Sequence, residues 1–343
     1  MASARQDATR GLIAFLRVLP SFTPYARLGF GRQEVSLIEA RNLTRKFGQL
    51  TAVEDLSLDA DEGEVLGLLG PNGAGKTTTI RMLAGIIAPT SGSAVIAGHR
   101  IPGEAGPLHE NIGLLTESPG FYDRLSAQRN LLYFAGFFSN IDLTAQVEKY
   151  LRALGLWERR DSRVGTFSKG MKQRLALARA LVHEPKVLFL DEPTAGLDPE
   201  AAQQVRDFIR RLGGAGRTVF LSTHNLAEAE QLCRRIAVIR TRLLALDTPR
   251  NLRDRFFRRE VAVRLQSVTD AVTQAVRNPP VVRNLRVDAD RLVVELAEPE
   301  RQRPELVQAV VDAGGRILEV AENRQPLEDV YLKLIHEDTP REP

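Results

Sequence analysis

The sequence predicts an α/β fold with a largely parallel main sheet, followed by a smaller α+β domain. The apolar run Glu64–Leu69 stops at glycines and leads into the helix-forming stretch Lys76–Leu83, as a buried parallel strand entering a helix does. Two further apolar runs, Val187–Leu190 and Thr218–Leu221, are followed by polar residues whose side chains can take part in binding or catalysis. Since ligands bind beyond the carboxyl ends of the strands in open α/β sheets, these ends are expected to converge on one site.

Composition is that of a globular protein with enough apolar material for two domains. Of its 343 residues 43% are hydrophobic, and 47 basic and 43 acidic residues are spread along the chain. This favours solvated, Arg-rich surfaces, and no nucleic-acid partner is expected. The single cysteine, Cys233, excludes an internal disulfide framework. The longest candidate membrane stretch, Leu12–Leu19, is short and contains Arg17, so we expect no channel or carrier from this chain alone.

The first 35 residues are expected to form a separate extension. Five arginines, two acidic residues and several helix breakers fall within residues 1–34. A disordered or loosely packed arm explains them; a membrane-surface or partner-docking segment and a cleaved transit peptide are the alternatives.

An antiparallel β layer is expected before the parallel sheet, because Leu56, Leu58 and Ala60 alternate with polar residues. Residues 126–160 are helical in composition, within a helical subdomain of about residues 120–180. Several large apolar side chains crowd one short span there, either as core or as a surface for partner docking. They are Leu131, Leu132, Phe134, Phe137 and Phe138.

The pattern changes after about residue 250, which predicts a main domain over 36–250 and a second over 251–343. Short alternating runs interleave with two helical stretches, in the order βαββαβ, which predicts a ferredoxin-like sandwich and a final helix. The strands are Val261–Leu265, Val281–Val287, Leu292–Leu296 and Ile317–Val320, the helices lie near 268–277 and 303–313, and the final helix spans Leu327–Ile335.

A phosphate-binding loop lies between the first parallel strand and its helix. Its residues, Gly70, Pro71, Asn72, Gly73, Ala74, Gly75, Lys76 and Thr77, match the pattern G-x-x-x-x-G-K-[ST]. Glycines let successive backbone N–H groups surround a phosphate, and the helix N-terminus adds partial positive charge. Lys76 then suits the β- and γ-phosphates of ATP, and the Thr77 hydroxyl suits Mg²⁺.

Three polar residues at the other strand ends complete a hydrolytic site. Asp191 closes its strand and is expected to hold Mg²⁺, whereas Glu192 is placed to polarise the attacking water. Taken alone, such a pair is typical of a helix cap or turn. His224 follows the next strand, where an imidazole could bond the γ-phosphate or the water; a lone histidine is otherwise usually structural.

The segment Phe167–Arg174, hereafter the signature segment, precedes an Ala/Leu-rich helix, with Ser168 as its expected cap. On its own this is an ordinary helix start. In this setting it resembles the signature motif of the ATP-binding cassette family, whose serine and glycine contact the γ-phosphate held by the opposite subunit. The resemblance therefore assigns Ser168 and Gly170 to nucleotide binding.

The resemblance covers residues from about 37 to 240, with the motifs in family order. It implies that Phe47 stacks on adenine and that the phosphate loop extends to Thr78. Ala195–Asp198 is similar to the loop that crosses the dimer seam, so Asp198 is included among the nucleotide-site residues. Glu192, His224 and Lys76 are the expected catalytic residues.

Two departures from the family pattern resemble its drug- and multidrug-export branch. Phe167, Lys169 and Met171 replace three positions of L-S-G-G-Q. Glu117 stands where the family usually has a glutamine that touches Mg²⁺ and senses the membrane partner. The tail phrase Leu327–Leu332 is also similar to the tails of bacterial exporter ATPases.

The resemblance implies an ATP-hydrolysing transporter subunit at the cytoplasmic face of a bacterial cell membrane. Two such subunits, identical or closely related, would enclose two MgATP and drive separately encoded transmembrane permease subunits through a groove near Glu117 to Arg129. The alternative is a soluble cassette ATPase acting on ribosomes or DNA. Lys76 and Ser168 are only 92 residues apart (168 − 76), which leaves no room for the coiled-coil insertion of chromosome-type members. The C-terminal domain is expected to serve dimerisation, with ligand sensing as the alternative.

Overall fold

The computed structural model describes residues 36–139, 142–257, 259–277, 282–296, 298–323 and 326–337. The expected N-terminal extension lies outside these residues. The chain forms two compact units, the first of described residues up to Leu66 with Gly75–Thr223, the second of Gly67–Ala74 with the described residues from His224 onward. The domain boundary proposed near residue 250 stays a prediction.

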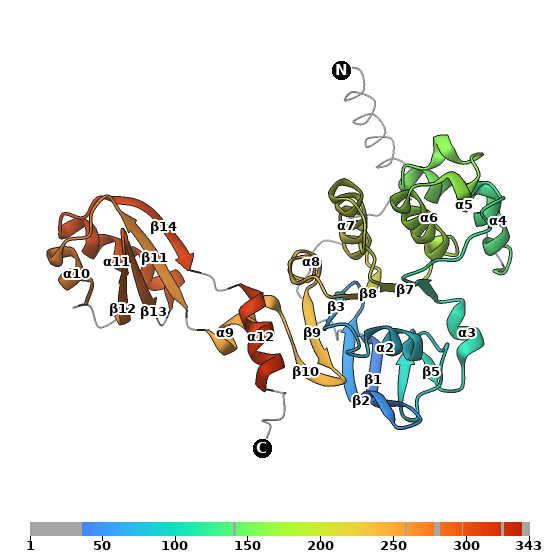
Figure 1. Cartoon of the computed structure of the whole chain (residues 1–343), viewed down its shortest axis with the longest axis horizontal. Coiled ribbons are helices and arrows are strands. Elements are labelled where there is room, and N and C mark those ends of the chain that lie inside the picture. Colours follow the sequence, from blue (N-terminus) through green and yellow to red (C-terminus); the bar gives the residue numbers. More distant parts are fainter. Residues whose placement is uncertain are drawn as a thin grey trace, which may run out of the picture. The chain divides into compact units, whose positions relative to one another are not determined.

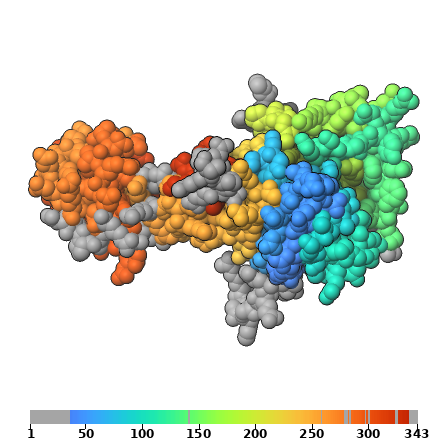
Figure 2. Space-filling view, turned by 60° about the horizontal axis from the view of Figure 1, so that its bottom comes forward, coloured from blue at the N-terminus to red at the C-terminus, as the bar shows by residue number. Residues whose placement is uncertain are grey.

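The expected antiparallel layer is present in the first unit. It comprises β1 (Ser36–Phe47), β2 (Leu50–Asp61), β4 (Ser91–Ile96) and β5 (His99–Ile101), in the order β2-β1-β4-β5. Ala40 of β1 pairs with Leu58 on one side and Ala94 on the other, and all three are buried. Figure 2 shows the blue residues of β1 and β2 at the surface, next to the cyan and teal residues that follow them.

The parallel sheet places the ends of its strands together. The first unit contains β8 (Thr218–Thr223), β7 (Val187–Asp191) and β6 (Ile112–Leu115), together with the first two residues of β3 (Val65–Leu69). β6 and β8 both run parallel to β7. Helix α2 (Lys76–Leu83) contacts β7 and β8, α7 (Pro199–Gly214) contacts β8, and α3 (Ala105–His109) contacts β5 and β6.

The helical subdomain consists of α4 (Ala127–Ala135), α5 (Leu143–Ala153) and α6 (Lys169–Leu181), with short 3₁₀ turns at Trp157–Arg159 and Val164–Thr166. The three helices pack on one another and are drawn in green in Figure 1. Each α-helix begins at a side-chain cap, namely Ser126, Asp142 and Ser168. Leu131 is fully buried as core, whereas Phe137 is 72% exposed. The core interpretation is wrong for Phe137 because α4 ends at Ala135, where the helical period stops.

The second unit contains the first part of the phosphate loop, Gly70–Ala74, with β9 (Arg235–Arg240) and β10 (Arg242–Asp247), in the sheet order β10-β9-β3. Helices α8 (Leu226–Leu232), α9 (Pro249–Phe256) and α12 (Leu327–Glu337) also belong to it, and α12 packs against both others. Figure 1 shows the red helix α12 beside α9. Arg240 Nη1 donates to the carbonyl of Ile335 at 3.1 Å, near the end of α12.

The βαββαβ order of the C-terminal region is confirmed. It runs β11 (Glu260–Leu265), α10 (Asp270–Arg277), β12 (Val282–Asp288), β13 (Arg291–Leu296), α11 (Pro299–Asp312) and β14 (Ile317–Asn323). The antiparallel sheet has the order β12-β13-β11-β14, as a ferredoxin-like sandwich requires. Its core includes Val261, Val263, Val272 and Leu306. Among the helices of the described ranges, none has the length and apolarity of a bilayer span.

Candidate active site

The phosphate loop is shaped by close contacts that only glycine permits. A Cβ on Gly70 would lie 2.4 Å from the carbonyl oxygen of Ile239. Thr241 N donates to the carbonyl of Ala74 at 3.0 Å, which ties the loop to the turn after β9. Gly73 has a φ of 83°, in the left-handed region that side chains disfavour. Glycine conformations and backbone contacts therefore fix the path of the loop.

Gly75 continues the cradle into the start of α2. Its φ is 96°, and a Cβ would lie 2.4 Å from the carbonyl oxygen of Ala52. No side chain caps α2 and no acidic residue occupies its first turn, so the partial positive charge of the helix N-terminus is available to a phosphate. Lys76, the first residue of α2, is 7% exposed.

Glu192, predicted to be catalytic, and Asp191, predicted to hold Mg²⁺, contact Lys76 and the end of β8, respectively. Lys76 Nζ lies 3.3 Å from Glu192 Oε1. Asp191, 3% exposed at the end of β7, accepts a 2.5 Å hydrogen bond from the Ser222 hydroxyl. Glu192 has a φ of 49°, a left-handed conformation that is uncommon outside glycine. This turn directs the two adjacent carboxylates to different partners.

Ser222 is a site residue to which the sequence interpretation assigned no role. Besides bonding Asp191, it accepts the backbone N–H of Glu192 through its carbonyl at 3.2 Å and its hydroxyl at 3.1 Å. Its place at the end of a buried strand was the available signal. The strand register, in which Asp191 pairs with Ser222, was not readable from sequence.

The oxygen ligands at this site fit Mg²⁺. Asp191 supplies a buried carboxylate, and Thr77 a half-buried hydroxyl at the start of α2. The described residues contain no group of three or more histidine, cysteine or acidic side chains that could hold a metal by themselves. Mg²⁺ usually keeps several waters and binds through one or two carboxylates plus substrate phosphates, so this sparse set suits it.

The signature segment and the loop after β7 each supply a helix cap, and the helices that they begin pack closely together. Ser168 Oγ accepts the N–H of Met171 at 3.2 Å, and Asp198 Oδ1 accepts that of Ala201 at 2.8 Å. A Cβ on Gly170 would lie 2.9 Å from the Cβ of Ala201, so this glycine lets α6 approach α7. Ser168 and Asp198 are both exposed, which leaves them accessible to a ligand or partner.

Three other residues predicted for the nucleotide site lie on separate elements. Phe47 ends β1, is 46% exposed, and has the Arg45 guanidinium 4.5 Å from its ring centroid. Glu117 is exposed after β6. His224 is exposed directly after β8 and belongs to the second unit. Their nucleotide roles stay predictions.

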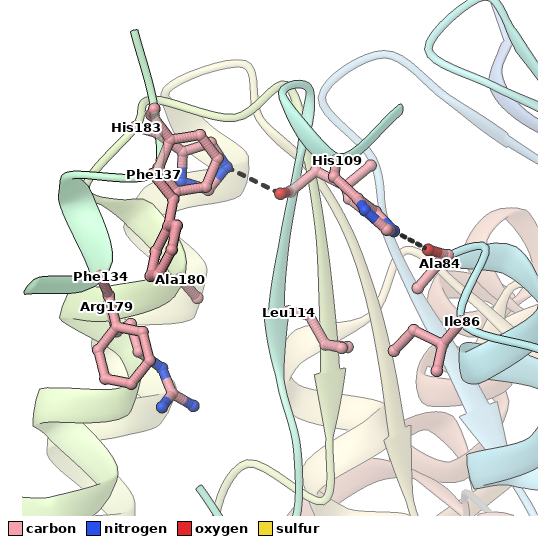
Figure 3. Close-up of a pocket in the computed structure, with 11 residues that line it drawn as sticks. Ala84, Ile86, His109, Leu114, Phe134, Phe137, Arg179, Ala180 and His183 are labelled. Atoms are coloured by element: carbon pink, nitrogen blue, oxygen red, sulfur yellow. Dashed lines mark hydrogen bonds between the residues drawn. The ribbon is translucent and has the colours of Figure 1, made fainter. Parts of the chain in front are cut away.

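A cavity of about 250 Å³ opens between α4, α6 and the core of the first unit. Figure 3 shows Phe134, Phe137 and Arg179 across the cavity from Ile86 and Leu114. Ile86 is 51% exposed at its rim. Arg179 Nη1 donates to the carbonyl of Gly120 at 2.7 Å, so the cavity adjoins the segment where a groove was expected.

His183 forms one wall of this cavity. Its ring stacks on Phe138 with centroids 3.9 Å apart, and its Nε2 lies 2.8 Å from the carbonyl oxygen of Ile112. Burial lowers the pKa of His183, although the Ile112 carbonyl opposes that shift. A neutral imidazole fits this aromatic wall.

Comparison with known proteins agrees with this geometry. The ABC transporter family matches residues 53–195. The fluoroquinolones export ATP-binding protein of Mycobacterium tuberculosis is 41% identical over 236 residues, covering 68% of this chain and 77% of that protein. The bacitracin transport ATP-binding protein BcrA of Bacillus licheniformis is 35% identical over 301 residues, covering 88% and 97%.

A solved ATP-binding subunit of an ABC transporter superposes with a TM-score of 0.59 at 31% identity, covering 64% of this chain and 93% of that one. The family match, the relatives and the residues of the phosphate loop all indicate the same family. The chain belongs to the ABC transporter family, as an ATP-binding subunit.

Proposed function

We propose that this chain drives export across a bacterial membrane by hydrolysing ATP in a two-subunit assembly docked on separately encoded permease subunits. As an ABC ATPase it binds and hydrolyses ATP, and ABC ATPase subunits work with transmembrane components. The export direction is supported by relatives named for fluoroquinolones export and bacitracin transport. A permease partner would hold the chain at the cytoplasmic face of the membrane.

The observation that carries the hydrolytic part is the Lys76–Glu192 pair beside buried Asp191. On ATP binding, the phosphate would take over Lys76, which frees the Glu192 carboxylate to orient water in line with the γ-phosphate. Thr77 and Asp191 would hold Mg²⁺, which neutralises charge on the phosphates. Placing Glu192 beside Lys76 keeps both charges compensated until the substrate arrives.

The assembly of two subunits is supported by the position of Ser168. It begins α6, whose main contacts are with α4, α5, α7 and β6, whereas α2 behind Lys76 contacts β2, β7 and β8. The exposed start of α6 thus presents a second helix N-terminus, with no acidic residue in its first turn. In the proposed assembly this end would face the nucleotide of the opposite subunit.

The permease contact is proposed at the cavity lined by Phe134, Phe137 and Ile86. An exposed apolar rim around a hollow is typical of a protein interaction site. Phe137 is 72% exposed, and Tyr133 beside it, with ring centroids 5.5 Å apart, is 48% exposed. An apolar side chain of a permease loop or short helix would fill the cavity.

The test is the rate of ATP hydrolysis per molecule as the chain concentration is raised. A rate that rises with concentration and is lost in both Lys76→Ala and Ser168→Ala establishes a site shared by two subunits. A concentration-independent rate that survives Ser168→Ala would refute the two-subunit proposal. Export and docking are tested by drug efflux from cells that carry the permease. The efflux rate with the unmodified chain is compared with the rate with Phe137→Glu.

The alternative of a cassette acting on ribosomes or DNA has no support in the relatives named above. Their names refer to export and to transport, and neither name mentions a nucleic acid.

A further inference from the structure

The signature helix α6 carries one buried polar side chain whose partner lies next to the catalytic carboxylate. Gln173, 6% exposed, donates from Nε2 to the carbonyl of Pro193 at 2.8 Å. Pro193 directly follows Glu192 and is itself buried. The contact joins residues 20 positions apart in the chain, so it is not part of a local helix pattern.

Glu192 is held in an unfavourable backbone conformation, and its two sides are fixed by different elements. Its φ of 49° belongs to the left-handed region, which persists in ordinary residues only where neighbouring contacts enforce it. Ser222 of β8 holds the N–H of Glu192, and Gln173 of α6 holds the carbonyl one residue later. We expect loss of either hydrogen bond to let the turn relax and to move the carboxylate away from Lys76.

We propose that Gln173 is a positioning residue for ATP hydrolysis, which acts through the Pro193 carbonyl to aim the Glu192 carboxylate. Gln173 lies five positions after Ser168. It therefore links α6, whose start would face the nucleotide of the opposite subunit, to the Glu192 carboxylate, which would act on the nucleotide of its own subunit. This inference rests on the proposed role of Glu192 as the residue that orients water.

Two substitutions separate hydrogen bonding from packing. Gln173→Met keeps the length and most of the volume of the side chain but removes the donor. Gln173→Glu restores a donor only in its protonated form, so it tests rescue by pH. Gln203→Met is the matched control, because Gln203 is exposed on α7 and its amide forms hydrogen bonds with Asp207 and Arg206 of the same helix.

The expected result is a fall in kcat of about tenfold for Gln173→Met with KM for ATP changed less than twofold, since positioning acts on the chemical step. Gln203→Met should hydrolyse ATP at the normal rate. Gln173→Glu should gain activity, relative to the unmodified chain, as pH is lowered. A fall confined to KM, no fall at all, or a Gln173→Glu profile parallel to the unmodified chain would overturn the proposal.

The decisive control repeats Gln173→Met in a Glu192→Gln background, measured by single-turnover hydrolysis. If Gln173 acts through Glu192, the second substitution lowers the residual rate less than twofold. A further tenfold loss would mean that Gln173 acts elsewhere. Failure of the proposed two-subunit function would be seen separately, as activity that survives Ser168→Ala while the dependence on Gln173 and Glu192 remains.

Discussion

Replacing Glu192 by glutamine tests whether ATP phosphate replaces the Glu192 carboxylate as the partner of Lys76. The two side chains are 7% and 14% exposed, and their charged atoms are 3.3 Å apart. Their Coulomb attraction is about 5 kcal/mol at an effective dielectric constant of about 20. Loss of one partner of a buried ion pair typically costs about 3–5 kcal/mol.

The amide of Glu192→Gln still accepts a hydrogen bond from Lys76, so the lower end, about 3 kcal/mol, is expected. For a unit of this size that lowers the melting temperature of the nucleotide-free chain by about 6–12 °C. ATP phosphate restores a negative partner to Lys76, so the variant should bind ATP more tightly, by up to about a hundredfold. Its hydrolysis should nearly stop, because no carboxylate remains to orient the water.

Calorimetric melting without nucleotide and equilibrium binding of ATP measure these two effects. Glu54→Gln is the control, because Glu54 is an exposed residue of β2. If Glu192→Gln has the melting temperature and the ATP affinity of the unmodified chain, ATP phosphate does not replace Glu192 as the partner of Lys76. A normal rate of hydrolysis in this variant would remove Glu192 from its catalytic role.

Three further outcomes are expected. Gly75→Ala should abolish ATP binding in a calorimetric titration, because its Cβ would meet the Ala52 carbonyl at 2.4 Å and its φ is 96°. Phe137→Ser should leave melting and basal hydrolysis unchanged, since this ring is 72% exposed, but should abolish transport in cells that carry the permease. Stability should fall as pH drops below about 6.5, because burial lowers the pKa of His183 and the unfolded chain therefore takes up its proton first. His183→Phe should make the melting temperature depend less on pH below about 6.5.

Local patterns in the sequence predicted most of the fold. The glycine spacing and the apolar strand before it located the phosphate loop, because strand, loop and helix are contiguous in the chain. Alternation in the C-terminal region predicted the βαββαβ sandwich for the same reason. The helix cap at Ser168 was predicted from local residue type. The cap at Asp198 has the same local origin, but Asp198 was assigned from the sequence only to the nucleotide site.

The contacts that position the carboxylates were not predictable, because each depends on elements that meet only in three dimensions. Ser222 bonds Asp191 and Glu192 through the register of β7 and β8. Gln173 reaches Pro193 because α6 packs close to the loop that follows β7. A polar residue on the otherwise apolar buried face of α6 was the only sequence signal for Gln173, since such side chains need a partner.

The tail phrase that resembles exporter ATPases has a packing explanation within the second unit. Leu327, Val330 and Leu334 recur at helical spacing on α12 and are 3%, 1% and 6% exposed. α12 packs against α8 and α9. Arg240 donates to a carbonyl near the C-terminal end of α12, where positive charge is favourable. Because α8 begins two residues after His224, removal of α12 would uncover a helix of the cassette and disturb more than the C-terminal sandwich.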